Sequence, residues 1–256
     1  MKKLHSLSGV VPVGVFLIEH LWTNSRALQG EDAFNQAVGD IQNLPYLPLI
    51  EVFGIFLPLA FHSFYGLYLA FRGKPNALKY PYATNWLYVM QRVTGVIAFA
   101  FICYHLGEFR VQKWLFGMRS EAFYQTLEAH LSSTYGGVPW LALLYMVGVG
   151  SAVFHFANGL AGVCMAWGLT VTKVAQRRAA VVCGAIGLAL FFLGANTVLF
   201  FATGTRFYLR SDVSGLAPHG VDEAAPGGPT PVIAVPGANP GAPTAAKPGG
   251  PAPSGH

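Results

Sequence analysis

Four histidines lie inside long apolar stretches of this sequence, where an imidazole side chain is costly. They are His20, His62, His105 and His155, one in each of the first four stretches that are apolar enough to cross a membrane. Ionisable side chains inside a membrane are rare and mostly functional. A single buried histidine is most often a structural residue bonded to a neighbouring helix, but one in each of four consecutive spans favours a shared chemical role.

Position along the spans sorts the four histidines into two levels. At about 1.5 Å of rise per residue, counting from the charged ends of the spans places His20 and His105 near one boundary. The same count places His62 and His155 roughly 10–15 Å further in. The spacing therefore predicts two pairs, His20 with His105 and His62 with His155.

Two neutral imidazoles that face each other across a helical bundle provide the axial ligands of a b-type haem. We therefore predict that the two pairs hold the irons of two haem b groups, one at each level. Zinc is disfavoured, because it usually takes three or four protein ligands and neither cysteine nor carboxylate accompanies the His62/His155 pair. Gly66 and Gly159 each follow a histidine of this pair by four residues and are expected to leave room for a porphyrin on the same helix face.

These side chains must be positioned by helices that cross a membrane. The chain is 53% hydrophobic and 11% charged, which is too apolar for a soluble protein of 256 residues. We predict an all-α membrane protein in which residues 1–210 form a five-helix transmembrane bundle that encloses the two haems. Residues 211–256, rich in alanine, proline and glycine, are expected to form a disordered tail. Five stretches reach the roughly 20 apolar residues that a bilayer requires, at about 4–22, 51–71, 87–107, 138–167 and 179–203.

Charged residues between the spans predict the orientation. Cytoplasmic loops of membrane proteins carry an excess of lysine and arginine. We therefore expect the N-terminus in the cytoplasm and the C-terminus outside. The net charge of +5 comes without a dense basic stripe, which disfavours nucleic acid as a partner. The basic residues that set the orientation are Lys2, Lys3, Arg72, Lys74, Lys79, Arg92, Lys173, Arg177 and Arg178.

Around these histidines the sequence is similar to a known family. Four segments carry the similarity: KLHSLSGVVPVGVFLIEHLW, EVFGIFLPLAFH, NWLYVMQRVTGV and SAVFHFANG. They closely resemble the di-haem cytochrome b subunit of succinate:menaquinone oxidoreductases, the five-helix membrane anchor of succinate dehydrogenases and fumarate reductases. The resemblance covers about residues 3–205.

The resemblance implies that the four histidines ligate two b haems in a bacterial cytoplasmic membrane. It also implies that the subunit anchors a flavoprotein with FAD and an iron–sulfur protein, in which the dicarboxylate chemistry takes place. Electrons from succinate would then pass through these partners and the two haems to menaquinone. Related fumarate reductases carry a glutamate two residues before the fourth haem ligand, where this chain has Val153. This departure favours the succinate-oxidising direction.

Three glutamates near the outer boundary are candidates for delivering protons to the quinone: Glu51, Glu108 and Glu19. Glu51 is the first choice, because it precedes the apolar run of the second span within one of the matching segments. Glu108 follows His105 by three residues and so shares its helix face. Simple solvation at the membrane interface is the alternative for each of the three.

Polar residues at the opposite boundary are candidates for holding haem propionates. They are His5, Ser6 and Arg92. Arginine is suited to this role because its charge-assisted hydrogen bonds to carboxylates are strong. Arg92 equally fits the excess of basic residues on the cytoplasmic side. His130 is expected to be solvated in an outer loop.

The sequence leaves two other functions open. One is the cytochrome b subunit of a fumarate reductase or of another quinone-linked dehydrogenase or hydrogenase. Subunits of those other dehydrogenases and hydrogenases need not use one histidine from each of four consecutive helices. The other is a haem-free anchor or transporter whose histidines relay protons. The haem content of the purified chain distinguishes this last function from the others.

Overall fold

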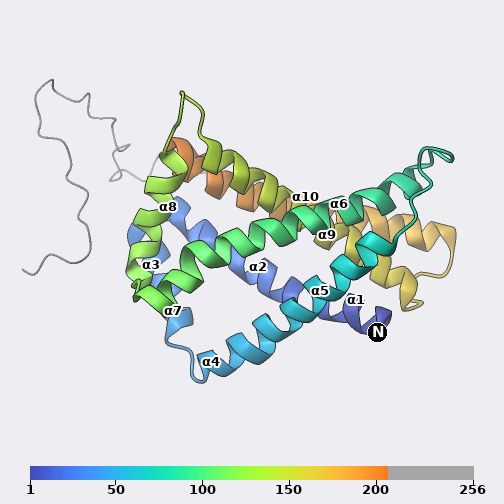
Figure 1. Cartoon of the computed structure of the whole chain (residues 1–256), viewed down its shortest axis with the longest axis horizontal. Coiled ribbons are helices and arrows are strands. Elements are labelled where there is room, and N and C mark those ends of the chain that lie inside the picture. Colours follow the sequence, from blue (N-terminus) through green and yellow to red (C-terminus); the bar gives the residue numbers. More distant parts are fainter. Residues whose placement is uncertain (207–256) are drawn as a thin grey trace, which may run out of the picture. The chain divides into compact units, whose positions relative to one another are not determined.

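The computed structural model describes residues 1–206, which fold into helices joined by short connections (Figure 1). Five helical stretches are long and apolar enough to cross a membrane, which confirms the predicted architecture. The predicted tail, residues 211–256, lies outside the described residues. The five stretches are Lys2–Gln29, Leu47–Arg72, Ala83–Phe116, Trp140–Ala166 and Lys173–Thr203.

The first span is interrupted by a proline. Helix α1 covers Lys2–Val10, and α2 covers Pro12–Ser25 before a 3₁₀ turn at Arg26–Gln29. Proline has no N–H to donate to the preceding turn, so the helix ends before Pro12 and begins again at it. His5 therefore lies on α1, and His20 lies on α2.

The second span contains a π-helical segment. The short α4, Leu47–Leu49, leads through the π-helical Ile50–Phe56 into α5, Leu57–Arg72. π-Helical turns are frequent at functional sites. This one carries the candidate Glu51.

The third span has the same construction in reverse order. Helix α6, Ala83–His105, continues through the π-helical Leu106–Val111 into α7, Gln112–Phe116. The span therefore ends at Phe116 rather than near residue 107. Its π-helical segment carries the candidate Glu108.

The last two spans, α9 (Trp140–Ala166) and α10 (Lys173–Thr203), pack against each other along their lengths. A Cβ atom at Gly187 would lie 2.6 Å from the Cβ atom of Ala157, so a glycine is required for this approach. Small residues at such contacts are typical of helices in membranes. α10 begins before the predicted residue 179 because the Thr172 hydroxyl accepts a hydrogen bond from the N–H of Ala175 and caps the helix.

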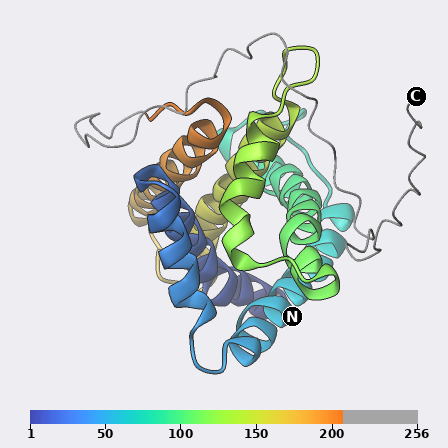
Figure 2. The ribbon, with the colours of Figure 1, turned by 90° about the vertical axis from the view of Figure 1, so that its left-hand side faces the viewer.

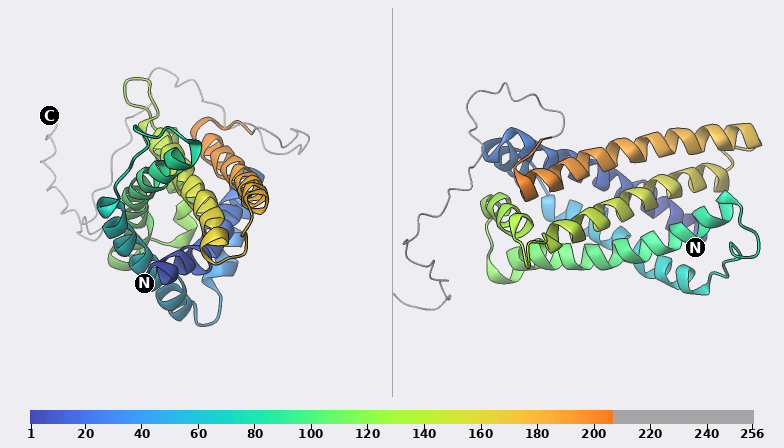
Figure 3. Two further views of the ribbon diagram at one scale, coloured as in Figure 1. Left: turned by 90° about the vertical axis from the view of Figure 1, so that its right-hand side faces the viewer. Right: turned by 90° about the horizontal axis from the view of Figure 1, so that it is seen from above.

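Short helices cover one end of the bundle. α3 (Glu31–Gln42), α7 and α8 (Phe123–Ser132) lie there, and we call it the cap end (Figures 1 and 2). The opposite end contains the N-terminus and the α5–α6 and α9–α10 connections, and we call it the basic end (Figure 3). The prediction that residue 130 lies in a loop is wrong, because α8 includes it.

Two apolar clusters hold the helices together. The first lies at the cap end and joins α3, α8 and α10 through Phe34, Tyr124, Leu131 and Phe201. The second joins α2, α9 and α10 through Leu21, Val153, Phe156 and Leu190. α5 makes no comparable core, and every one of its residues keeps part of its surface exposed.

Candidate functional site

His62 on α5 and His155 on α9 lie next to each other, with ring centroids 6.0 Å apart and ring planes at 84°. The Nδ1 atom of His62 lies 3.0 Å from the carbonyl oxygen of His5, and that of His155 lies 2.9 Å from the carbonyl oxygen of Gln91. Because a carbonyl oxygen only accepts, both Nδ1 atoms carry the hydrogen and donate it. Each Nε2 atom therefore keeps its lone pair, as a metal-binding imidazole requires.

His20 on α2 and His105 on α6 form a second pair, with ring centroids 5.7 Å apart and ring planes at 73°. The Nδ1 atom of His105 lies 3.2 Å from the hydroxyl oxygen of Tyr145 on α9. His20 is held less firmly. The Asn24 amide lies 3.4 Å from both of its ring nitrogens and donates its shortest hydrogen bond, 2.7 Å, to the His20 carbonyl oxygen.

The ring separations are slightly shorter than those of two imidazoles on one metal ion. Metal–imidazole bonds of about 2.0–2.1 Å place two opposed ring centres about 6.3 Å apart, once roughly 1.1 Å from nitrogen to ring centre is added on each side. The observed separations are 5.7 and 6.0 Å. Within residues 1–206, no group of three or more histidine, cysteine, aspartate or glutamate side chains could hold a metal ion. Paired imidazoles are a donor set suited to the two axial positions of a haem iron.

Two glycines on facing helices let the histidine rings take these positions. A Cβ atom at Gly9 on α1 would lie 2.2 Å from Cε1 of His62, and one at Gly95 on α6 would lie 2.8 Å from Cε1 of His155. Any larger residue would push the ring away. Sequence spacing missed both glycines, because which residue faces a histidine depends on how two distant helices are aligned.

The glycines that the sequence singled out have other neighbours. A Cβ atom at Gly66 would lie 3.0 Å from Nε2 of His5, and one at Gly159 would lie 3.2 Å from the Gln91 side-chain nitrogen. The nearest neighbours of these two positions are therefore protein side chains. The observed contacts do not support the interpretation that they leave room for a porphyrin.

His5 and Gln91 flank the His62/His155 pair. The His5 ring stacks on that of His62 with centroids 4.2 Å apart, and its buried Nε2 atom has no hydrogen-bond partner among residues 1–206. The Gln91 amide donates to the His155 carbonyl oxygen at 3.0 Å and accepts from Asn158 at 2.7 Å. α6 and α9 are thus joined by reciprocal bonds around His155, which fix its ring.

Arg92 and Ser6 lie near the basic end but bond to other groups. The Arg92 guanidinium donates to the carbonyl oxygen of Tyr88 at 3.1 Å and lies over the Tyr88 ring, and its buried Nε atom has no partner within residues 1–206. The Ser6 hydroxyl donates to backbone carbonyl oxygens of the preceding turn. A propionate contact from either residue stays a prediction.

Glu108 is the most buried of the three candidate glutamates, with 7% of its side chain exposed. It accepts one hydrogen bond from the Tyr145 hydroxyl and one from Nδ1 of His130 on α8. His130 is 45% exposed and in contact with Glu108, so the expectation that it is merely solvated is wrong. A half-exposed histidine, a buried carboxylate and a phenol thus connect the surface of the cap end to His105.

The other two glutamates have different surroundings. Glu51 forms an ion pair with Arg110, which joins the two π-helical segments. Glu19 is exposed and accepts a hydrogen bond of 2.6 Å from the hydroxyl of Thr23. Glu51 is therefore already balanced by a cation, and Glu19 is the most accessible to solvent.

Two comparisons with known proteins find relatives of this chain. The family model described as succinate dehydrogenase/fumarate reductase transmembrane subunit matches residues 72–194. The succinate dehydrogenase cytochrome b558 subunit of Bacillus subtilis (strain 168) is 42% identical over 200 residues, which cover 78% of this chain and 95% of that protein.

Proposed function

This chain belongs to the family of succinate dehydrogenase/fumarate reductase transmembrane subunits, and on that premise we propose how its residues serve that role. It is the membrane-anchor cytochrome b subunit of a succinate dehydrogenase. It connects an iron–sulfur partner to menaquinone by way of two b haems. The observation that carries the proposal is the pair of facing histidines at each of two levels of one membrane-spanning bundle.

The residues that would hold the two haems are His62 with His155 and His20 with His105. Haem b supplies one-electron transfer when bound at these levels. The protein fixes the His62 and His155 rings through backbone carbonyl acceptors, and Gly9 and Gly95 admit the rings. His5 stacks on His62, and its buried Nε2 atom has no hydrogen-bond partner within the described part of the chain, which supports its predicted role in holding a propionate.

Reduction of menaquinone by two electrons also consumes two protons. Glu108 is the best-supported residue to hold and pass a proton, because it is buried beside the His105 level and bonded to the half-exposed His130. Glu51 is less suited, since its ion pair with Arg110 stabilises the charged carboxylate. This placement of the proton route favours quinone reduction near the cap end.

The partners and orientation follow from the same proposal. The flavoprotein with FAD and the iron–sulfur protein carry out the dicarboxylate chemistry and dock at the basic end, which faces the cytoplasm by the positive-inside rule. The cap end then faces the outside of a bacterial cytoplasmic membrane. Electrons that move outward are favoured by the membrane potential by about 2.3 kcal/mol per charge per 100 mV.

A fumarate reductase is the second candidate, and one residue distinguishes the two directions. Val153, in the position where related fumarate reductases have a glutamate, is only 2% exposed and packs with Leu21, Phe156 and Leu190. This apolar packing supports succinate oxidation, since a carboxylate there would be buried without an observed partner.

The proposal is tested by purifying the chain with its complex in mild detergent. We expect a flavoprotein and an iron–sulfur protein to co-purify, and a pyridine haemochrome assay to give two b haems per chain. A preparation that contains no haem would overturn the proposal and would favour a haem-free anchor or transporter.

A further inference from the structure

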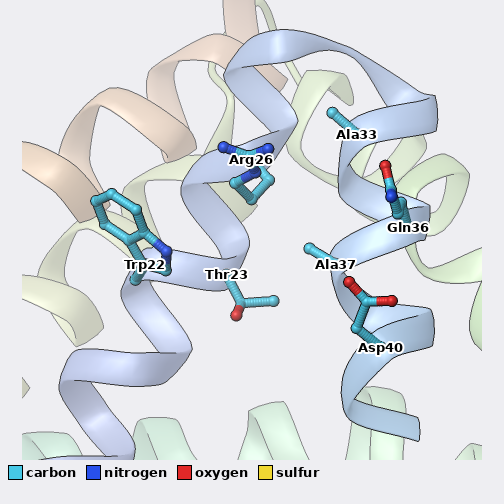
Figure 4. Close-up of a pocket in the computed structure, with 7 residues that line it drawn as sticks. All are labelled: Trp22, Thr23, Arg26, Ala33, Gln36, Ala37 and Asp40. Carbon is cyan, nitrogen blue, oxygen red and sulfur yellow. The ribbon is translucent and has the colours of Figure 1, made fainter. Parts of the chain in front are cut away.

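A polar pocket lies between the end of the first span and α3 (Figure 4). Its volume is about 320 Å³, at the lower limit for small-molecule sites. Trp22 and Thr23 of α2 and Arg26 of the following turn form one wall, and α3 forms the other. The α3 residues that line it are Ala33, Gln36, Ala37 and Asp40.

Two opposite charges in this pocket have no partner among residues 1–206. Arg26 is half-buried and Asp40 is exposed, and neither forms a hydrogen bond or an ion pair with any residue in the range 1–206. Figure 4 shows them on different walls, Arg26 on the turn after α2 and Asp40 on α3. The Arg26 guanidinium nitrogens are not among the buried, unpartnered side-chain atoms of residues 1–206, so a ligand in the pocket can reach them, and a bound anion would accept charge-assisted hydrogen bonds from them.

The pocket lies at the end of the first span, where the length and composition of that span predict the lipid headgroups. Arg26 belongs to the last turn of the Lys2–Gln29 span. Trp22, which is 62% exposed, lies one turn earlier, and exposed tryptophans gather at the membrane–water interface. Ala33 and Ala37, one turn apart on α3, leave the space between the helices open.

The charges of α3 select the type of headgroup. The helix carries Glu31, Asp32 and Asp40 and has no lysine or arginine. A headgroup that carries only a phosphate would approach Arg26 but would be repelled by these carboxylates. A headgroup that also carries an ammonium group would satisfy both walls.

We propose that this pocket binds the headgroup of a phosphatidylethanolamine. Arg26 donates hydrogen bonds to the phosphate, and Asp40 accepts an N–H from the primary ammonium. The choline headgroup has the same charges but no N–H to donate, so it binds less well. Phosphatidylglycerol lacks the cation and binds least. The site is independent of the proposed electron transfer.

The test uses the whole complex in nanodiscs with equal amounts of phosphatidylethanolamine, phosphatidylcholine and phosphatidylglycerol. Lipids that remain bound after detergent extraction are quantified by mass spectrometry. We expect phosphatidylethanolamine to be enriched severalfold, because a solvent-accessible charge contact is worth up to about fivefold in affinity. Arg26→Gln and Asp40→Asn should each lower this enrichment, and Asp40→Glu should retain most of it.

Arg119→Gln is the matched control. Arg119 is also at the cap end, but it is 83% exposed and pairs with Glu121, so its replacement should leave lipid retention unchanged. Haem content and thermal unfolding of each variant establish that the complex is intact. Equal retention of the three lipids by the wild-type complex would overturn the proposal. So would variants that lose menaquinone affinity while their lipid retention stays unchanged, since the pocket would then be a quinone site.

Discussion

The phenol of Tyr145 donates a hydrogen bond to the buried carboxylate of Glu108 and thereby joins α9 to the π-helical segment that follows α6. Since its hydrogen is used in this bond, the hydroxyl oxygen is left to accept one from Nδ1 of His105. Three side chains from two spans are therefore joined by hydrogen bonds, from His105 to Tyr145 and from Tyr145 to Glu108.

Replacing Tyr145 with phenylalanine removes an acceptor for His105 and a donor for Glu108. A buried group that loses its partner costs about 1–3 kcal/mol. We expect the haem at the His20/His105 level to remain bound with an altered low-temperature EPR signal, while that of the other level stays unchanged. Tyr135→Phe is the control, because Tyr135 is exposed in the α8–α9 connection and its replacement should alter neither signal. An unchanged signal in Tyr145→Phe would contradict the hydrogen-bond order.

The ligand pairs predict a specific loss of haem. His155→Ala should remove one b haem and leave the other, because only the His62/His155 pair loses a ligand. The pyridine haemochrome assay should then give one haem per chain rather than two. His130→Ala should retain both, since His130 contacts Glu108 and neither ring pair. Retention of both haems by His155→Ala would show that the pairing is wrong.

Gly95→Ala should act on the same level without removing a ligand. The added Cβ atom would lie 2.8 Å from Cε1 of His155, and overpacking of this kind typically costs about 1–3 kcal/mol. We expect weaker haem retention at the His62/His155 level, measured by absorption during gel filtration. Gly162→Ala on α9 is the matched control, because its new methyl group meets no atom within 4 Å and its haem content should stay at the wild-type level.

Glu108→Gln should separate proton delivery from haem binding. The amide keeps the size of the carboxylate but cannot take up and release a proton, and loss of such a group lowers rates by about 10²–10⁴-fold. We expect slow menaquinone reduction with normal haem content, measured by stopped-flow oxidation of the reduced complex. Glu121→Gln, at an exposed position of the same end, should keep the wild-type rate. A wild-type rate in Glu108→Gln would exclude Glu108 from the proton route.

The five spans could be predicted from the sequence, and so could which two histidines form each pair. Both depend on features that lie within a single span. A span is recognised from the hydropathy of one continuous segment. The depth of a histidine follows from the number of residues between it and the charged end of its span. α8 could also have been predicted, since its buried Tyr124, Leu127 and Leu131 recur at helical spacing. At ten residues it is too short for a membrane span, so hydropathy alone does not reveal it.

Contacts between distant helices could not be predicted in this way. Gly9 faces His62, and Glu108 meets Tyr145, only because of how the helices are rotated and aligned. That alignment depends on close approaches such as Gly187 against Ala157, which a single sequence does not specify. The functional residues that the sequence missed are accordingly partners across helices.

The break at Pro12 has a consequence for how such a protein can evolve. It separates α1, which carries His5 and Gly9 and packs on α5, from α2, which carries His20 and packs on α10. Each half of the first span is thus aligned by its own neighbour rather than by a continuous ladder of hydrogen bonds. Substitutions on α1 can therefore change the surroundings of His62 while those of His20 stay the same, so the two histidine pairs are free to diverge independently.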